Sequence, residues 1–211
     1  MTTLRQYRLA LQIFQSNRLR RDYNDLAEIP QYTPVGEFFF SEIYGPRDFS
    51  RRDEEARRLH GLLHMLPGVA MRDVEEVLEL LELTVVLDDE LARLMLDQGV
   101  GLDFDEATYE RFYREADSYG PRLRQLTLVR DCLYNVFRLS RSQLLGLGLH
   151  RSRLLARLMG LEAAHTFLVR GFDALCGVQS IEQFAETIYG RELQRLDRIY
   201  GRDAEHGQEA V

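Results

Sequence analysis

The chain has 211 residues, of which 45% are hydrophobic and 29% charged, and its formal charge at pH 7 is −7. This is an ordinary soluble balance, long enough for one domain with a sizeable core or at most two small domains. There is no apolar run of the 18 residues that a membrane span needs and no basic-then-apolar leader after Met1, so we expect a cytoplasmic protein without a membrane partner.

All 27 basic residues are arginine, and lysine is absent. Arginine pairs well with carboxylates and phosphates, although a GC-rich genome gives the same bias without any function. The negative net charge opposes an extended phosphate-binding face, so nucleic acid is not an expected partner. Cys132 and Cys176 are far apart and lack metal-ligand spacing, which argues against a disulfide scaffold or a zinc finger and favours two buried thiols.

Helical periodicity dominates the chain, and no stretch alternates as a strand does. We therefore predict an all-α, single-domain, multi-helix bundle over residues 1–200, followed by a frayed tail over 201–211. A polar connection over 24–33 separates the first two helices. The expected helices, in chain order, cover about 3–21, 34–44, 50–66, 71–96 with a break near Thr84 left open, 103–118, 121–139, short helices within 140–159, 161–176 and 180–200.

Local signals set several of these boundaries. Thr3 is a plausible N-cap, Thr33 is followed by Pro34 at the first helical position, and Ser50 with Asp53 resembles a capping box. The second helix stops at residues 45–46, a Gly-Pro pair.

Three consecutive rings, Phe38, Phe39 and Phe40, lie in this short second helix, which ends near Tyr44. Successive helical side chains point about 100° apart, so the three rings cannot share one buried stripe. We expect a central aromatic helix enclosed by several others; the alternative is that one ring belongs to an exposed patch that receives a partner. The charges that follow are expected to satisfy one another and nearby helix ends, and they are Arg47, Asp48, Arg52 and Asp53.

The segment FFFSEIY, residues 38–44, resembles the signature of the bacterial FFLEELY-motif proteins. The likeness continues through YGPRDFSRRD at 44–53, RGF at 170–172 and FAETIYGRE at 184–192. The departures are Phe40, Ser41 and Ile43, where the motif has leucine, glutamate and leucine. The resemblance implies an all-helical protein and carries over no activity and no catalytic residue.

Histidines raise the question of a metal. His60 and His64 are four residues apart, a metal-binding spacing, but the sequence HGLLH lacks the glutamate of an HExxH motif. Glu162 and His165 form one ExxH pair, whereas di-iron bundles use two such pairs with further glutamates. A border histidine bonded to Asp53 or a carbonyl, and a hydrogen-bonded core histidine at 165, are the favoured interpretations, and no metal or cofactor is expected.

Arg130 and Glu192 fall inside the apolar arcs of their helices, and a buried charge is too costly to leave unpaired. We therefore hypothesise that they meet inside the bundle, together with His165 or Glu42. Such a cluster is a buried ion pair that fixes helix register, a polar pocket for a small ligand, or a site of acid–base catalysis, in that order of preference.

Two functions follow from these features. The first is a non-enzymatic protein that acts through a protein partner or by self-association, suggested by apolar material such as VEEVLELLELTVVL at 74–87. The alternative is a bundle that binds a small ligand, or less readily a metal, in an internal polar pocket. No constellation combines a nucleophile, a base and an oxyanion donor, so no catalytic residue is assigned.

Overall fold

The computed structural model describes residues 3–43, 45, 50–63 and 71–202. Within these ranges every regular element is a helix, so the predicted all-α class is confirmed. From residue 203 onward, the expected C-terminal tail lies outside the described residues.

The helices follow one another with short connections. The first half of the chain forms α1 (Leu4–Asp22), α2 (Asn24–Ala27), α3 (Thr33–Phe38), the π-helix η1 (Phe39–Ile43), α4 (Ser50–Leu63) and α5 (Met71–Asp97). The second half forms α6 (Glu106–Glu115), α7 (Tyr119–Ser140), α8 (Gln143–Arg151), α9 (Arg153–Leu158), α10 (Glu162–Cys176) and α11 (Glu182–Tyr200).

Local chemistry explains most boundaries and the main differences from the sequence prediction. Thr3 caps α1 in a capping box with Gln6, as its position suggested. Helix α5 runs without a break at Thr84, whose hydroxyl donates to the Leu80 carbonyl 2.7 Å away. Helix α7 begins before Pro121 rather than after it, because a proline in the first turn removes no helical hydrogen bond. The predicted connection over 24–33 contains the short helix α2.

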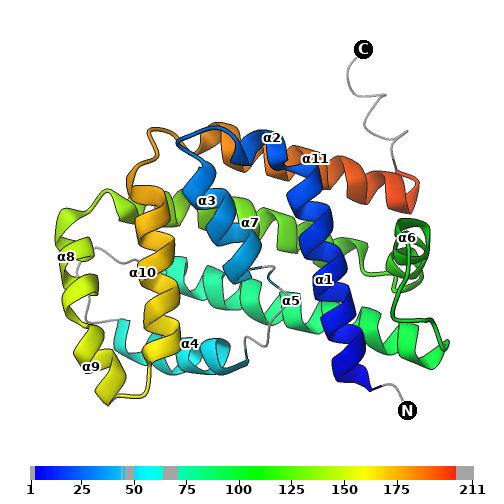
Figure 1. Cartoon of the computed structure of the whole chain (residues 1–211), viewed down its shortest axis with the longest axis horizontal. Helices are drawn as coiled ribbons and strands as arrows, with labels where there is room; N and C mark the ends of the chain where they lie inside the picture. Colours follow the sequence, from blue (N-terminus) through cyan, green and yellow to red (C-terminus); the bar gives the residue numbers. More distant parts are fainter. Residues whose placement is uncertain (1–2, 44, 46–49, 64–70, 203–211) are drawn as a thin grey trace.

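The long helices and the crossing helices form the body of the molecule (Figure 1). Helix α7 lies between α5 and α11 and packs against both. Helices α1, α3 and α10 cross these long helices; α1 packs on α5, and α10 packs on α7, α3 and α4. The pair α8 and α9 lies beside α10 at one end of the molecule, and α6 lies at the other (Figure 1).

The aromatic segment is enclosed at two of its three rings, because Phe39 and Phe40 are buried whereas Phe38 is only half-buried. Phe39 and Phe40 are 2% and 3% exposed, and both belong to the main apolar core. The Phe38 ring lies 5.3 Å, centroid to centroid, from Phe167 of α10. The guanidinium of Arg20 on α1 lies 5.3 Å above the Phe40 ring. The segment changes from α-helix to π-helix at Phe39, which the sequence did not indicate. Of the motif residues, Tyr44, Arg47 and Asp48 lie outside the described residues.

Candidate functional site

The buried charges of the motif segment join three helical elements. Arg52 of α4 lies 2.6 Å from the Asp53 carboxylate and donates to the Glu42 carbonyl of η1. The Glu42 carboxylate pairs with Arg170 of α10, and Arg52 lies 4.8 Å from the Phe167 ring of the same helix. Arg52 and Asp53 therefore satisfy each other and a helix end; the other two charges of the predicted set, Arg47 and Asp48, lie outside the described residues.

The FFFSEIY segment and the RGF segment meet in space. Arg170 and Gly171 come from the RGF segment, and Glu42 and Phe38 come from the FFFSEIY segment. The Phe38 ring lies so close to Gly171 that a Cβ atom there would approach the ring to 3.0 Å. These residues hold η1, α3 and α10 together, and the contacts between them are structural.

The predicted pairing of Arg130 with Glu192 is wrong. Arg130 lies 3.2 Å from the carboxylate of its neighbour Asp131, and its guanidinium covers the Tyr189 ring at 4.6 Å. The side chain is 30% exposed, so the aromatic ring covers its stem while its charged end reaches water. A helical wheel placed Arg130 in an apolar arc but gave no information on the ring that faces it.

Glu192 has a different partner, which the sequence analysis did not single out. Its two carboxylate oxygens accept from Arg18 of α1 at 2.6 and 3.0 Å, and one of them also accepts from the Tyr23 hydroxyl at 2.7 Å. Burial opposes the charge on Arg18, but the Glu192 carboxylate outweighs this effect and raises the pKa of Arg18 above its ordinary value. Burial, followed by the negative charge of Glu192, also raises the pKa of Tyr23.

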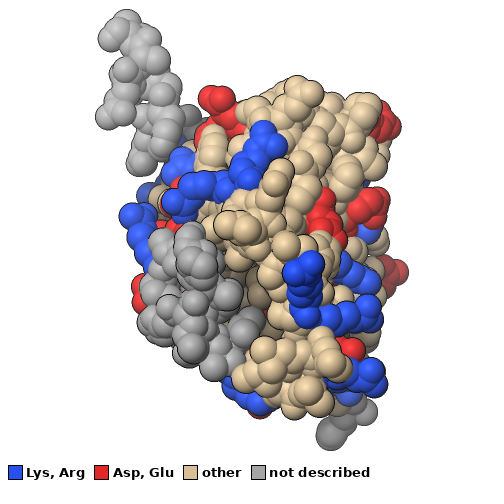
Figure 2. All heavy atoms as spheres, turned by 90° about the vertical axis from the view of Figure 1, so that its left-hand side faces the viewer, with Lys and Arg blue, Asp and Glu red and all other residues tan. Residues whose placement is uncertain are grey.

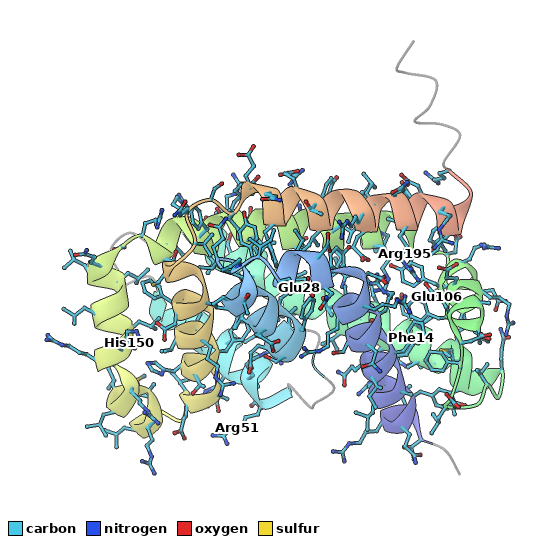
Figure 3. The ribbon with its side chains drawn as sticks, turned by 45° about the horizontal axis from the view of Figure 1, so that its top comes forward. Phe14, Glu28, Arg51, Glu106, His150 and Arg195 are labelled. Atoms are coloured by element: carbon cyan, nitrogen blue, oxygen red, sulfur yellow. The ribbon has the colours of Figure 1, made fainter. Side chains whose placement is uncertain are left out.

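This pair borders a hollow of about 730 Å³ between α1 and α11. Further ion pairs surround it: Arg191 with Asp25 at 2.6 Å, and Arg195 with Glu106 at 2.9 Å. Figure 3 shows Arg195 of α11 and Glu106 of α6 pointing toward each other. Nη2 of Arg195 lies 2.9 Å from the Glu110 carboxylate, whereas the buried Nε of Arg18 has no hydrogen-bond acceptor among the described residues. The walls of the hollow therefore carry paired charges and one buried donor without an acceptor.

The remaining predicted residues are distributed over other places. His165 is 7% exposed, and its Nε2 lies 2.8 Å from the Leu149 carbonyl oxygen and 3.2 Å from the Ser152 hydroxyl. It is a hydrogen-bonded core histidine, the interpretation that the sequence favoured, and Glu162 is exposed. The His60 side chain and His64 lie outside the described part of the chain. In the part that is described, no group of three or more His, Cys, Asp or Glu side chains is placed to hold a metal ion.

An exposed apolar surface covers α8 and α9. Leu144 is 83% exposed, Leu158 is 77% and Leu154 is 68%. We call this surface the basic leucine face; it consists of Leu144, Leu147, Leu154, Leu155, Leu158 and Met159, with Arg151, Arg153 and Arg157. Figure 2 looks onto this end of the molecule and shows uncharged and basic surface side by side.

Small residues on the inner side of the two helices explain why the leucines face outward. Gly146 of α8 lies against Phe172 of α10, where a Cβ atom would come within 2.7 Å of the ring. Ala156 of α9 is buried. Because these small residues face the core, the larger apolar side chains of the same helices remain on the outer side.

The three arginines of the basic leucine face differ from most others in the protein. Arg18, Arg191 and Arg195 all pair with carboxylates. In contrast, Arg151, Arg153 and Arg157 make no hydrogen bond or ion pair within the described residues. No acidic residue occurs between Asp131 and Glu162 in a chain whose net charge is −7. The exposed leucines therefore lie beside uncompensated positive charge.

The sequence held signals for both surfaces that its analysis missed. The acid-free run over 132–161 and the leucines on all sides of two short helices indicated an apolar surface. Arg18 is close in the sequence to Arg20 and Arg21, which are exposed. Its contact with Glu192 of α11, which no local pattern indicates, distinguishes the buried arginine from these neighbours.

Taken together, the fold and these surfaces define an α-helical bundle with a buried polar junction and an exposed basic leucine face. The chain belongs to the family described as "Domain of unknown function (DUF8198)", whose model matches residues 1–206. No curated protein and no solved structure matches the chain. Among the described helices, none combines the length and the apolar character that a membrane span requires.

Proposed function

We propose that the protein is a cytoplasmic, non-enzymatic binding module that acts through a protein partner docked on the basic leucine face. The observation that carries this proposal is the exposure of neighbouring large apolar side chains on α8 and α9, from 39% at Met159 to 83% at Leu144. Contiguous apolar surface of this kind marks interaction sites in soluble proteins.

The expected gain from covering this surface is large enough to support a complex. Burying one exposed leucine fully contributes roughly 1.5 to 3 kcal/mol, so the six apolar side chains together contribute on the order of 5 to 10 kcal/mol. A micromolar complex needs about 8 kcal/mol after the ordering costs of association have been met. Burial of these side chains alone therefore supports at most a weak, reversible complex, and a tighter one needs further contacts such as charge pairs with the arginines.

The sequence prediction placed the interacting material on residues 74–87, and part of that segment remains a weaker candidate. Leu80 and Leu87 are buried, whereas Val85 and Val86 are 49% and 51% exposed. We also propose that the chain is related to the FFLEELY-motif proteins. The motif lies in the aromatic segment, and the resemblance implies no activity. We assign the binding role to α8 and α9 because their apolar side chains are more exposed.

A photo-cross-linking amino acid placed at Leu158 tests the proposal in cells that make the protein. We expect a discrete protein adduct that disappears when Leu154→Ser is added. The matched control carries Val85→Ser and Val86→Ser, which make the same chemical change at an exposed apolar pair on α5. An adduct that is absent, or that survives Leu154→Ser in a folded protein, contradicts the proposal.

The second candidate function is the binding of a small ligand in the hollow beside Arg18 and Glu192. It is favoured by the buried Nε of Arg18, a residue that lines the hollow and whose Nε has no acceptor among the described residues. A ligand with a carboxylate or carbonyl oxygen would supply this acceptor. Native mass spectrometry of the gently purified protein should then show a bound mass that Arg18→Gln removes, and a ligand-free protein counts against this candidate.

A further inference from the structure

We propose that the basic leucine face binds an acidic amphipathic helix of a partner protein. This inference rests on the proposed function and adds the shape and the charge of the partner. Three observations support the inference. The leucines of the face have helical spacing, the arginines beside them are unpaired, and two copies of the face would repel each other.

The apolar side chains and the arginines form parallel rows. On α9, Leu154 and Leu158 are four residues apart, and so are Arg153 and Arg157. Residues four apart lie above one another on a helix surface, so a row of arginines runs beside a row of leucines. On α8, Leu144 and Leu147 continue to Arg151 with spacings of three and four. Each helix thus presents an apolar ridge flanked or ended by positive charge.

These ridges suit a helical partner. Helices pack by placing the ridges of one between those of the other, and the apolar rows of α8 and α9 supply such ridges. The described residues contain no strand, so the face has no free sheet edge to which an extended peptide can add. Recognition therefore depends on side chains, as it does when an amphipathic helix lies on an apolar surface.

The charge of the face selects an acidic partner. Arg151, Arg153 and Arg157 have no carboxylate partner within the described residues, although the protein pairs exposed arginines elsewhere, as Arg124 does with Glu79 at 2.6 Å. Glutamates on the flanks of a docked helix would neutralise all three. Complementary charge of this kind raises the association rate and excludes partners of the wrong sign.

The same charge argues against symmetric pairing of two copies through this face. In a two-fold dimer the same patch contacts itself. Leucine would meet leucine, but three uncompensated arginines from each copy would also be brought together without any carboxylate from 132–161. A second copy is therefore a poorer occupant than an acidic helix from a different protein.

Fluorescence anisotropy with two designed peptides tests this inference. Both are helices of about 18 residues with leucine at i, i+3, i+4 and i+7; one has glutamate on its flanks and the other has lysine. We expect the glutamate peptide to bind at least about tenfold more tightly than the lysine peptide, and its binding to weaken as salt rises from about 50 to about 500 mM.

Matched variants assign the binding to the face. Arg151→Gln, Arg153→Gln and Arg157→Gln combined should weaken binding of the glutamate peptide about tenfold. The control combines Arg5→Gln, Arg93→Gln and Arg111→Gln, three exposed arginines on other helices, and gives the same change in net charge. It should leave the affinity within about twofold. Leu154→Ser with Leu158→Ser should abolish binding.

The possible failures are distinguishable. If both peptides bind equally, and only the leucine variant matters, the acidic partner is overturned while the proposed function stands. If neither peptide binds, or the leucine variant binds as well as the wild type, both are overturned. Binding to vesicles of phosphatidylglycerol and phosphatidylcholine without peptide binding overturns a protein partner in favour of a membrane surface. A dimer in light scattering that Leu154→Ser and Leu158→Ser disperse identifies a second copy instead.

Discussion

Arg18 on α1 and Glu192 on α11 form a two-pronged ion pair, with nitrogen–oxygen distances of 2.6 and 3.0 Å, that joins the first helix to the last. The Arg18 side chain is 8% exposed and the Glu192 side chain 15%. Removal of one member leaves the other charge buried without its partner, which is far more destabilising than loss of a surface pair.

We predict that Glu192→Ala lowers the free energy of unfolding by about 3 kcal/mol. Arg130→Ala is the control, because the Arg130 side chain is partly exposed and contacts the adjacent, partly exposed Asp131 and the Tyr189 ring, and it should cost less than about 1 kcal/mol. Urea unfolding of both variants measures the difference. Equal effects would contradict the structural assignment and restore Arg130 as a candidate partner.

The close approach of α8 to α10 leads to a second prediction. Gly146→Ala should destabilise the protein by about 1 to 3 kcal/mol, because the added methyl group meets the Phe172 ring at 2.7 Å in a filled core. Gly148→Ala, two residues along the same helix, has open space around its Cβ position and should stabilise by about 0.5 to 1 kcal/mol through helix propensity. Thermal unfolding of both variants measures their stability relative to the wild type. A change in the same direction for both would contradict the close packing of Gly146 against Phe172.

Features that depend on neighbouring residues were predictable from the sequence. The all-α class, the cap at Thr3 and the proline start of α3 all rest on patterns within a few residues. The burial of Phe39 and Phe40 on different sides of their segment also followed from the sequence, because consecutive helical rings cannot share one face, whereas the half-buried Phe38 did not. The change to a π-helix at Phe39 did not follow, because it depends on packing against other elements.

Features that depend on what faces a helix were not predictable. A helical wheel shows which side of its own helix a residue occupies, but not the side chain opposite. Arg130 and Glu192 were thus paired with each other, although Tyr189 and Arg18 are their neighbours. The exposure of the leucines of α8 and α9 was not predictable for the same reason. Only the position of these helices at the edge of the fold exposes Leu144 and its neighbours.

The two cysteines differ in exposure, which corrects the expectation of two buried thiols. Cys132 is buried and Cys176 is exposed. Burial raises the pKa of the Cys132 thiol to about 12, so little thiolate forms there at neutral pH. We predict that a disulfide reagent labels Cys176 in the native protein and reaches Cys132 only after unfolding. In Cys176→Ser the native reaction should vanish, whereas Cys132→Ser should keep it; two equally reactive thiols would contradict the burial of Cys132.

The start of α10 supplies a prediction about pH. The Glu55 carboxylate of α4 is 5% exposed and accepts from the backbone amides of Ala163 and Ala164 at 2.6 and 3.0 Å. Arg51 also donates to this carboxylate, at 2.8 Å. Burial opposes the charged form of Glu55, but these bonds outweigh it and hold the pKa of Glu55 below its usual value.

Because the folded-state pKa of Glu55 is lowered, its carboxylate stabilises the fold above the ordinary glutamate pKa, and this contribution is lost as the pH falls through the lowered value. Glu55→Gln should therefore lower the free energy of unfolding by about 1 to 3 kcal/mol at about pH 7. The difference in free energy of unfolding between Glu55→Gln and the wild type should become smaller toward about pH 3, because both side chains are then uncharged. Glu54→Gln, an exposed neighbour, is the control and should change stability little at either pH. If this difference stays constant between about pH 7 and about pH 3, the charge of Glu55 does not contribute to its hydrogen bonds with the α10 amides.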